Sequence, residues 1–147
     1  MIAINLEVFG SPAPQGSKSF KGIHGGRAVL AESSKKVRPW RMDVKACAEA
    51  FARDCVDLLP LDAPLRVSMV FTLPKPLSAP KRRRTYPCRL PDLSKLARST
   101  EDALTDAGLW RDDARVVEYA RLAKVYPGED VDALASPGVR IRIEVIE

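Results

Sequence analysis

The chain has 147 residues, 46 % of them hydrophobic and 29 % charged, which suits one compact domain over residues 1–147 and is short for two. This composition excludes wholesale disorder, and no apolar run approaches the roughly 18 residues needed to cross a bilayer. Lys and Arg number 24 against 19 Asp and Glu, and the resulting charge of +5 favours a polyanion as the partner.

Elements can be predicted in chain order from the apolar spacing. Alternation predicts strands over residues 2–8, 65–73, 115–126 and 139–146, and helical spacing predicts helices from Arg38 to near Pro60 and over 94–107. Residues 10–34, 74–91 and 127–138 have the composition of loops. We therefore expect an α+β domain in which two main helices pack on a small mixed sheet of about four strands.

Cysteine and histidine are too few for a structural zinc site. Cys47, Cys55 and Cys88 form no CxxC pair and His24 is the only histidine, which excludes a zinc finger. Cys47 lies in the apolar stripe of the first predicted helix together with Cys55, where a buried position is expected. Glu7 and the lack of a basic lead predict no secretory signal, and the odd cysteine count favours the cytoplasm.

Charge is segregated along the chain. Residues 74–91 contain six bases and no acid, whereas residues 92–113 contain six acids and three bases. An enzyme that acts on nucleic acid with a divalent cation needs both, because bases neutralise phosphates and carboxylates hold the cation. The alternative is that both segments are only solvated surfaces.

Two faces are expected on the helix over 94–107. Its core face is formed by Leu93, Leu96, Ala97, Thr100, Ala103, Leu104 and Ala107. Ser94, Arg98, Glu101 and Thr105 share a stripe away from that face. Asp92 precedes the helix, and Asp112-Asp113 follow it; only the fold can bring these carboxylates together.

Three segments carry a resemblance to a known family: Pro91-Asp92-Leu93-Ser94-Lys95-Leu96, Asp102-Ala103-Leu104-Thr105, and Gly108-Leu109-Trp110-Arg111-Asp112-Asp113-Ala114-Arg115-Val116-Val117. At this spacing the chain resembles the RusA-type Holliday-junction resolvases. Weaker similarities occur at 14–18, at 39–41 and at Lys124. The resemblance implies a homodimeric, magnesium-dependent endodeoxyribonuclease that cuts a four-way DNA junction by paired symmetric nicks in recombination and repair. Small members of this family are often encoded by phages or prophages.

The resemblance also assigns residues. It implies catalytic roles for Asp92, Asp113 and Arg98. The alternative role of Arg98 is an ordinary ion pair with Glu101. Asp92 and Asp113, with Glu101 or Asp112, are expected to hold Mg²⁺, for which Mn²⁺ is a substitute, and no small-molecule cofactor or membrane is expected. Candidate DNA contacts are Lys18, Lys81, Arg82, Arg83, Arg84, Lys95 and Lys124. Tyr86 either stacks on an unpaired base or packs on its own domain.

One position departs from the family pattern. Ser94 stands where these resolvases have a second aspartate, so the expected metal site lacks one negative charge. Either Ser94 caps the helix and Glu101 supplies the missing carboxylate, or the chain is a weakened or inactive nuclease that still binds branched DNA. An RNA-binding basic domain is a third candidate, but it leaves the acidic segment unexplained.

Overall fold

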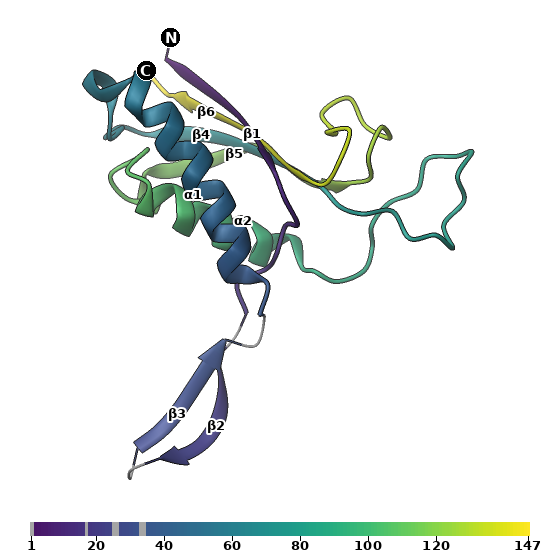
Figure 1. Ribbon diagram of the computed structural model, residues 1–147. Coiled ribbons are helices and arrows are strands. Elements are labelled where there is room, and N and C mark those ends of the chain that lie inside the picture. The colour runs from purple at the N-terminus through teal and green to yellow at the C-terminus, as the bar shows by residue number, and fades with distance from the viewer. Residues whose placement is uncertain (1, 17, 25–26, 33–34) are drawn as a thin grey trace.

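A four-stranded mixed sheet forms the centre of the molecule in the computed structural model (Figure 1). Its strands are β1 (Ala3–Phe9), β4 (Leu65–Thr72), β5 (Val116–Val125) and β6 (Gly138–Val145), in the order β1-β6-β4-β5. The strand β6 is antiparallel to both β1 and β4, whereas β5 is parallel to β4. The expected mixed sheet and strand number are confirmed.

The structure describes residues 2–16, 18–24, 27–32 and 35–147, with the backbone alone for 18–24 and 27–32. The side chains of Lys18 and His24 therefore lie outside the described part. No helix in the described ranges combines the length and the apolar character that a membrane span requires.

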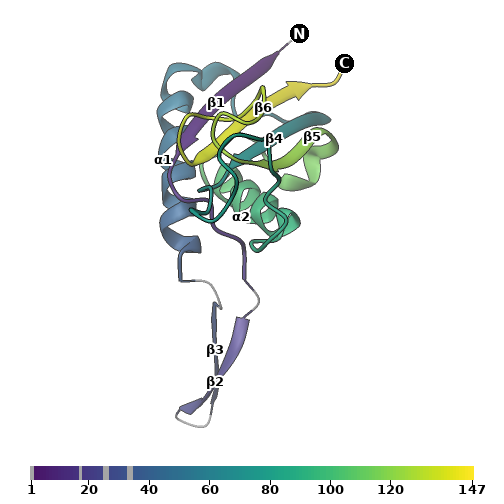
Figure 2. The ribbon, with the colours of Figure 1, turned by 90° about the vertical axis from the view of Figure 1, so that its right-hand side faces the viewer.

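Two helices cover one face of the sheet, α1 (Val37–Asp54) and α2 (Leu93–Asp106), and they lie side by side (Figures 1 and 2). Pro39 lies in the first turn of α1, where its missing N–H costs no helical hydrogen bond. Buried Trp40 donates from Nε1 to Thr100 Oγ1 at 3.1 Å, which fixes α1 against α2. The core face expected for α2 is confirmed, with Leu96, Ala97, Thr100, Ala103 and Leu104 buried and Leu93 and Ala107 partly buried.

Alternation explains which side of the sheet is buried. Val67, Met69 and Phe71 face the helices, as do Ile141 and Ile143 of the neighbouring strand. On the opposite side, arginines face carboxylates, in the ion pairs Arg66–Glu118, Arg66–Glu144, Arg142–Glu144 and Arg140–Glu7. Because these charges balance one another, the open face of the sheet is a poor candidate for binding a polyanion.

Two predicted boundaries are wrong. Residues 10–34 were expected to be a loop, but β2 (Lys18–His24) and β3 (Arg27–Glu32) pair there as an antiparallel hairpin that projects from the domain (Figure 1). The sequence signal for it is Gly25-Gly26, a dipeptide typical of short hairpin connections. The first helix was expected to reach Pro60, but α1 ends at Asp54 and a short 3₁₀ turn, η1 (Val56–Leu58), follows.

The early end of α1 changes the environment of its last apolar residues. The Cys55 backbone leaves the helical region, Leu58 is exposed, and Leu59 packs on the core from extended backbone. Helical spacing could not reveal this, because a 3₁₀ turn keeps a similar three-residue period. Cys47 and Cys55 are both partly buried, where full burial was expected. Burial raises the pKa of the Cys47 thiol.

Candidate active site

Asp92 occupies the N-terminal end of α2. It is the N-cap residue, its half-exposed carboxylate lies 3.6 Å from Lys95 Nζ, and Lys95 is also exposed. An acidic side chain at this end interacts favourably with the helix dipole. Beside it is a hollow of about 370 Å³, lined by Pro12, Ala13, Pro14, Gly16, Lys36, Leu90, Pro91, Asp92 and Lys95. The Gln15 N–H donates to Lys95 O at 3.0 Å and ties the segment after β1 to the start of α2.

Ser94 does not cap α2, so that interpretation was wrong. The N–H groups of Lys95 and Leu96 donate to Asp92 O at 3.1 and 3.0 Å, which places the helix start at Leu93. Ser94 is therefore inside the first turn, with its side chain exposed. The N-terminal end of α2 carries one carboxylate fewer than the resemblance implies.

Four carboxylates gather toward the other end of α2. Glu101 and Asp102 come from the helix, whereas Asp112 and Asp113 come from the turn into η2 (Asp113–Arg115). Burial raises the pKa of Glu101, as do the nearby charges of Asp113 and Asp102, while a hydrogen bond donated by the Tyr119 hydroxyl opposes them. Glu101 therefore lies close enough to Asp113 for their charges to interact.

The Asp112–Asp113 pair is itself asymmetric. The Ala114 N–H donates to Asp112 Oδ1 at 2.7 Å and lowers the pKa of that carboxyl. The pKa of Asp113 is raised, first by its hydrogen bond with Asp112 and then by burial and by the charges of Asp112 and Asp102. Crowded carboxylates of this kind favour a bound cation, because the cation relieves their mutual repulsion.

A rigid support holds the turn that carries these two aspartates. Leu61 N–H donates to Leu109 O, and Arg111 N–H donates to Leu61 O, both at 2.9 Å. Buried Trp110 donates from Nε1 to Thr105 Oγ1 at 2.6 Å, so Thr105 is partly buried, whereas its stripe was expected to face away from the core. Arg115 Nε adds an ion pair with Asp62 Oδ1 at 2.7 Å.

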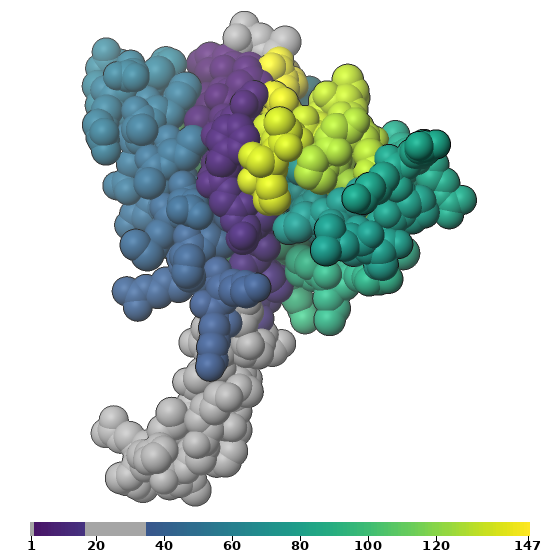
Figure 3. Space-filling view, turned by 45° about the vertical axis from the view of Figure 1, so that its right-hand side comes forward, coloured from purple at the N-terminus to yellow at the C-terminus, as the bar shows by residue number. Residues whose placement is uncertain are grey.

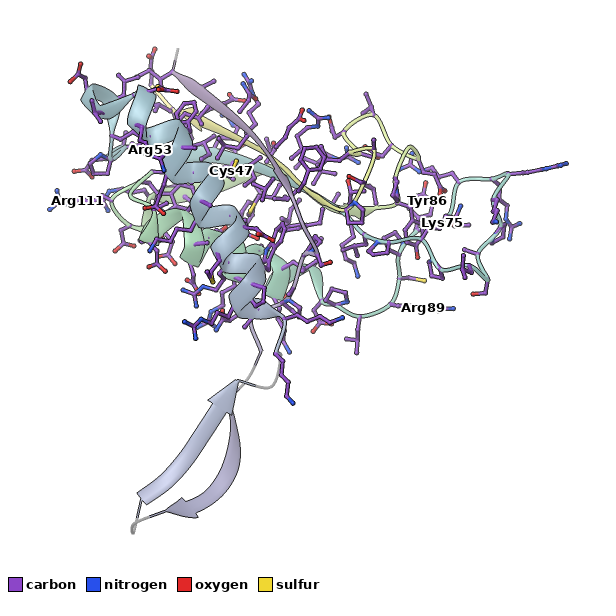
Figure 4. All side chains as sticks on the ribbon, in the orientation of Figure 1. Cys47, Arg53, Lys75, Tyr86, Arg89 and Arg111 are labelled. Atoms are coloured by element: carbon purple, nitrogen blue, oxygen red, sulfur yellow. The ribbon has the colours of Figure 1, made fainter. Side chains whose placement is uncertain are left out.

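The two acidic ends of α2 do not meet within one chain. Nine residues separate Asp92 from Glu101, which is about 13 Å along a helix axis. Figure 4 shows Arg89, just before Asp92, and Arg111, just before Asp112, at opposite sides of the molecule. In the part of the chain that the structure describes, no three acidic, histidine or cysteine side chains are close enough to hold a metal ion together.

Arg98 lies on α2 between these ends, one turn before Glu101. Its side chain is exposed, and among the described residues it forms no ion pair. The alternative pairing with Glu101 is therefore not formed, and the guanidinium is accessible to a substrate phosphate.

Residues 74–91 form a long loop, here named the basic arm, which extends beyond the end of the sheet (Figure 1). Lys81, Arg82 and Arg83 are exposed on it, and they have no ion-pair partner in the described ranges. Arg84 differs, because its guanidinium binds Asp130 at 2.8 Å and lies 4.8 Å from the centre of the Tyr86 ring. Lys124 Nζ donates to the backbone oxygens of Arg89 and Pro91, at 2.8 and 3.0 Å.

The acidic segment 127–138 holds the basic arm in place, and Figure 3 shows the two packed together. Glu129 accepts from the Thr85 N–H at 2.8 Å and binds Lys75 Nζ at 2.6 Å. Asp130, whose side chain is only 4 % exposed, is shared between Arg84 and Arg121. Sequence reasoning missed the contacts between the acidic segment and the basic arm, although the opposite charges of segments 74–91 and 127–138 were a signal for them. It also missed Tyr119.

Comparison with protein families gives a match to Endodeoxyribonuclease RusA over residues 10–144. Comparison with curated proteins gives no match. The matched range includes both acidic ends of α2, Arg98 and the basic arm. Because it spans nearly the whole chain, the protein belongs to the RusA family of endodeoxyribonucleases, whose activity is the resolution of Holliday junctions.

Proposed function

We propose that this chain resolves four-way DNA junctions by paired symmetric nicks in a Mg²⁺-dependent reaction. The observation that carries the proposal is the arrangement along α2, where exposed Arg98 lies between carboxylates at both ends. The basic arm adds three exposed basic residues, Lys81, Arg82 and Arg83, for phosphate contacts.

The donor groups suit Mg²⁺. All are hard carboxylate oxygens, and the raised pKa values of Glu101 and Asp113 indicate a place where positive charge is lacking. Magnesium is commonly held by one or two carboxylates, with water and substrate phosphate as the remaining ligands, so a three-carboxylate cage is not required. Asp113 would hold the ion with Glu101 or Asp112. When bound, the Mg²⁺ ion would lower the pKa of a water molecule and stabilise the leaving oxygen.

Other residues act directly on the substrate. Arg98 binds the phosphate and offsets the charge that builds on its non-bridging oxygens. Lys81, Arg82 and Arg83 bind neighbouring phosphates, and because these contacts involve no base edges they give affinity without sequence preference. Lys95, at the entrance of the hollow beside Asp92, is a further phosphate contact.

We propose a homodimer as the active form, since an isologous pair presents two equivalent sites to a nearly symmetric junction. The separation of Asp92 from Asp113 supports a second chain, because an ion bound at about 2 Å from its ligands cannot reach both ends of α2. A two-fold partner would bring Asp92 of one chain to Asp113 of the other. Mixing Asp92→Asn and Asp113→Asn subunits should then restore one nick, whereas sites built within single chains would stay inactive.

The proposed chemistry is tested with the variant Asp113→Asn. Cleavage should be abolished, while junction binding in a native gel is retained or tightened, because a negative charge near the phosphate is removed. Loss of binding with unchanged cleavage per bound complex would contradict the metal-binding role.

A second candidate is a branched-DNA binder without nuclease activity, and Ser94 is the observation that favours it. Such a protein would retard a junction without cutting it in either Mg²⁺ or Mn²⁺. We propose the cytoplasm as the compartment for either function, supported by the free thiols of Cys47, Cys55 and Cys88.

A further inference from the structure

A second hollow, of about 220 Å³, lies on the basic arm, and no carboxylate from either end of α2 lines it. Its walls include Pro76, Pro80, Thr85, Tyr86, Arg89 and Tyr126. Pockets for drug-sized ligands occupy about 300–1,000 Å³, so this one is matched to a single planar ring system. Figure 4 shows Tyr86 and Arg89 on the arm, beyond the end of the sheet.

Tyr86 is unusually exposed for an aromatic residue that is held rigidly. The residue is 64 % exposed, whereas Tyr126, which also lines the hollow, is 6 % exposed. The backbone at Tyr86 is fixed by the Cys88 N–H, which donates to Tyr86 O at 2.8 Å, and by buried Pro87. The arm therefore keeps a large apolar ring in water at a defined place, a cost that a ligand would offset.

The ring is also backed by a positive charge. The Arg84 guanidinium lies 4.8 Å from the ring centre and is held there by Asp130 at 2.8 Å. With one face covered by Arg84, the ring offers its other face as a stacking platform. Aromatic and arginine side chains together are the usual platform for unpaired bases.

The chemistry of the walls favours a base over a phosphate. Pro76, Pro80 and Tyr126 offer apolar contact, whereas Ser78, Thr85 and Arg89 add polar groups to the same walls. This mixture suits a nucleobase, whose faces are apolar and whose edge is polar, better than a phosphate, which has no apolar face. Thr85 Oγ1 is buried in the wall and has no hydrogen-bond partner among the described residues. The polar edge of a nucleobase would give this hydroxyl a partner.

We infer that Tyr86 and this hollow bind an unpaired nucleobase from the centre of a branched DNA. The inference rests on the proposed function and deepens it, because paired bases in a duplex remain stacked and cannot enter. The arm would then contribute selectivity as well as affinity, with Lys81, Arg82 and Arg83 on phosphates and Tyr86 on a base.

Binding without divalent cation tests this inference. We expect Tyr86→Ala to weaken junction binding about tenfold, within the range for loss of one stacked base, and to leave duplex binding within twofold of wild type. Tyr86→Phe should bind as wild type does, because stacking needs the ring and not the hydroxyl. Val131→Ala is the matched control, since Val131 is 92 % exposed on the adjoining acidic segment.

Abasic DNA shows whether a base is the ligand. Abasic residues at the crossover should weaken wild-type binding as much as Tyr86→Ala does, and the two changes should not add, because they remove the same contact. If wild type binds intact and abasic junctions with equal affinity, and Tyr86→Ala binds both as wild type does, the inference is overturned.

A single-stranded oligonucleotide separates this inference from the proposed function, because it offers unpaired bases without a junction. If wild type shows no preference for junctions over duplex, the proposed function fails. The base site still stands if Tyr86→Ala weakens single-strand binding, and it falls as well if that binding is unchanged.

Discussion

Tyr119 and Glu101 join the edge strand β5 to α2 beside Asp113. The Tyr119 hydroxyl donates a hydrogen bond to Glu101 Oε2, and its own pKa is raised by burial and by this carboxylate. Hydrogen bonds to ligand carboxylates fix their orientation, and their loss weakens metal binding. In the proposed enzyme Tyr119 is thus a positioning residue, and it acts through Glu101.

Tyr119→Phe removes only that hydroxyl. We expect the Mg²⁺ concentration for half-maximal cleavage to rise about tenfold, the lower end of the effect of such outer contacts. Junction binding without metal should not change. Glu101→Gln should also raise the Mg²⁺ concentration for half-maximal cleavage. If both variants need the same Mg²⁺ concentration as wild type, Glu101 has only a structural role.

Among the elements, the basic arm divides its charges between two tasks. Lys81, Arg82 and Arg83 are exposed and unpaired in the described part of the chain, whereas Arg84 is bound to Asp130. Each phosphate contact contributes about 0.9 to the slope of log affinity against log salt concentration. We therefore expect replacement of neighbouring arginines on the arm to change this salt slope by unequal amounts.

The double variant Arg82→Ala/Arg83→Ala should lower the magnitude of this salt slope by roughly 2, because two phosphate contacts are lost. Arg84→Ala should change the slope by much less, since its charge is already neutralised by Asp130. Fluorescence anisotropy at several salt concentrations measures both. A slope change for Arg84→Ala of half that of the double variant, which is the effect of one full phosphate contact, would show that Asp130 does not withhold Arg84 from DNA.

Asp130 makes the attachment of the arm dependent on pH. Hydrogen bonds from Arg121 and Arg84 hold the pKa of its carboxyl well below the ordinary value, against the effect of burial. A pKa that is lower in the folded than in the unfolded chain stabilises the fold above the unfolded value of about 3.9. This stabilisation is lost as the pH falls below that value toward the folded pKa.

Asp130→Asn should lower the free energy of unfolding by about 1.5–3 kcal/mol at pH 7, the scale of a charged hydrogen bond. The difference from wild type should shrink below about pH 4, as the unfolded carboxylate takes up its proton. Urea unfolding at pH 7 and pH 3 measures it, with Asp57→Asn as an exposed control. A difference of equal size at both pH values would contradict the account.

At the scale of the whole molecule, the predictable parts are those set by local pattern. Strands β1, β4 and β6 follow from alternation, because one side of β1, β6 and the first half of β4 is more deeply buried than the other, and α2 follows from its apolar face. The stripe on α2 put Glu101 away from the helix's core face, but its nearness to Asp113 depends on the fold. Tyr119 was not predictable, because its contact depends on where β5 lies beside α2.

Long-range pairing explains the other misses. Arg84 and Asp130 are 46 residues apart, and no local period connects them. The apolar residues of β2 are few and those of β3, residues 28–31, are consecutive, so neither strand of this hairpin shows a clear alternation and the glycine pair was the remaining cue. The separation of Asp92 from Asp113 could be predicted only by treating α2, which lies between them in the chain, as a rigid spacer.

A labelled four-way junction tests the central claim most directly. The purified chain is incubated with it in the presence and absence of Mg²⁺, beside Asp92→Asn, and the products are separated on a denaturing gel. The account predicts paired nicks at symmetric positions that require both Mg²⁺ and Asp92. A junction that is retarded in a native gel but stays uncut in Mg²⁺ and Mn²⁺ would contradict it, and would make this chain a junction binder on a nuclease fold.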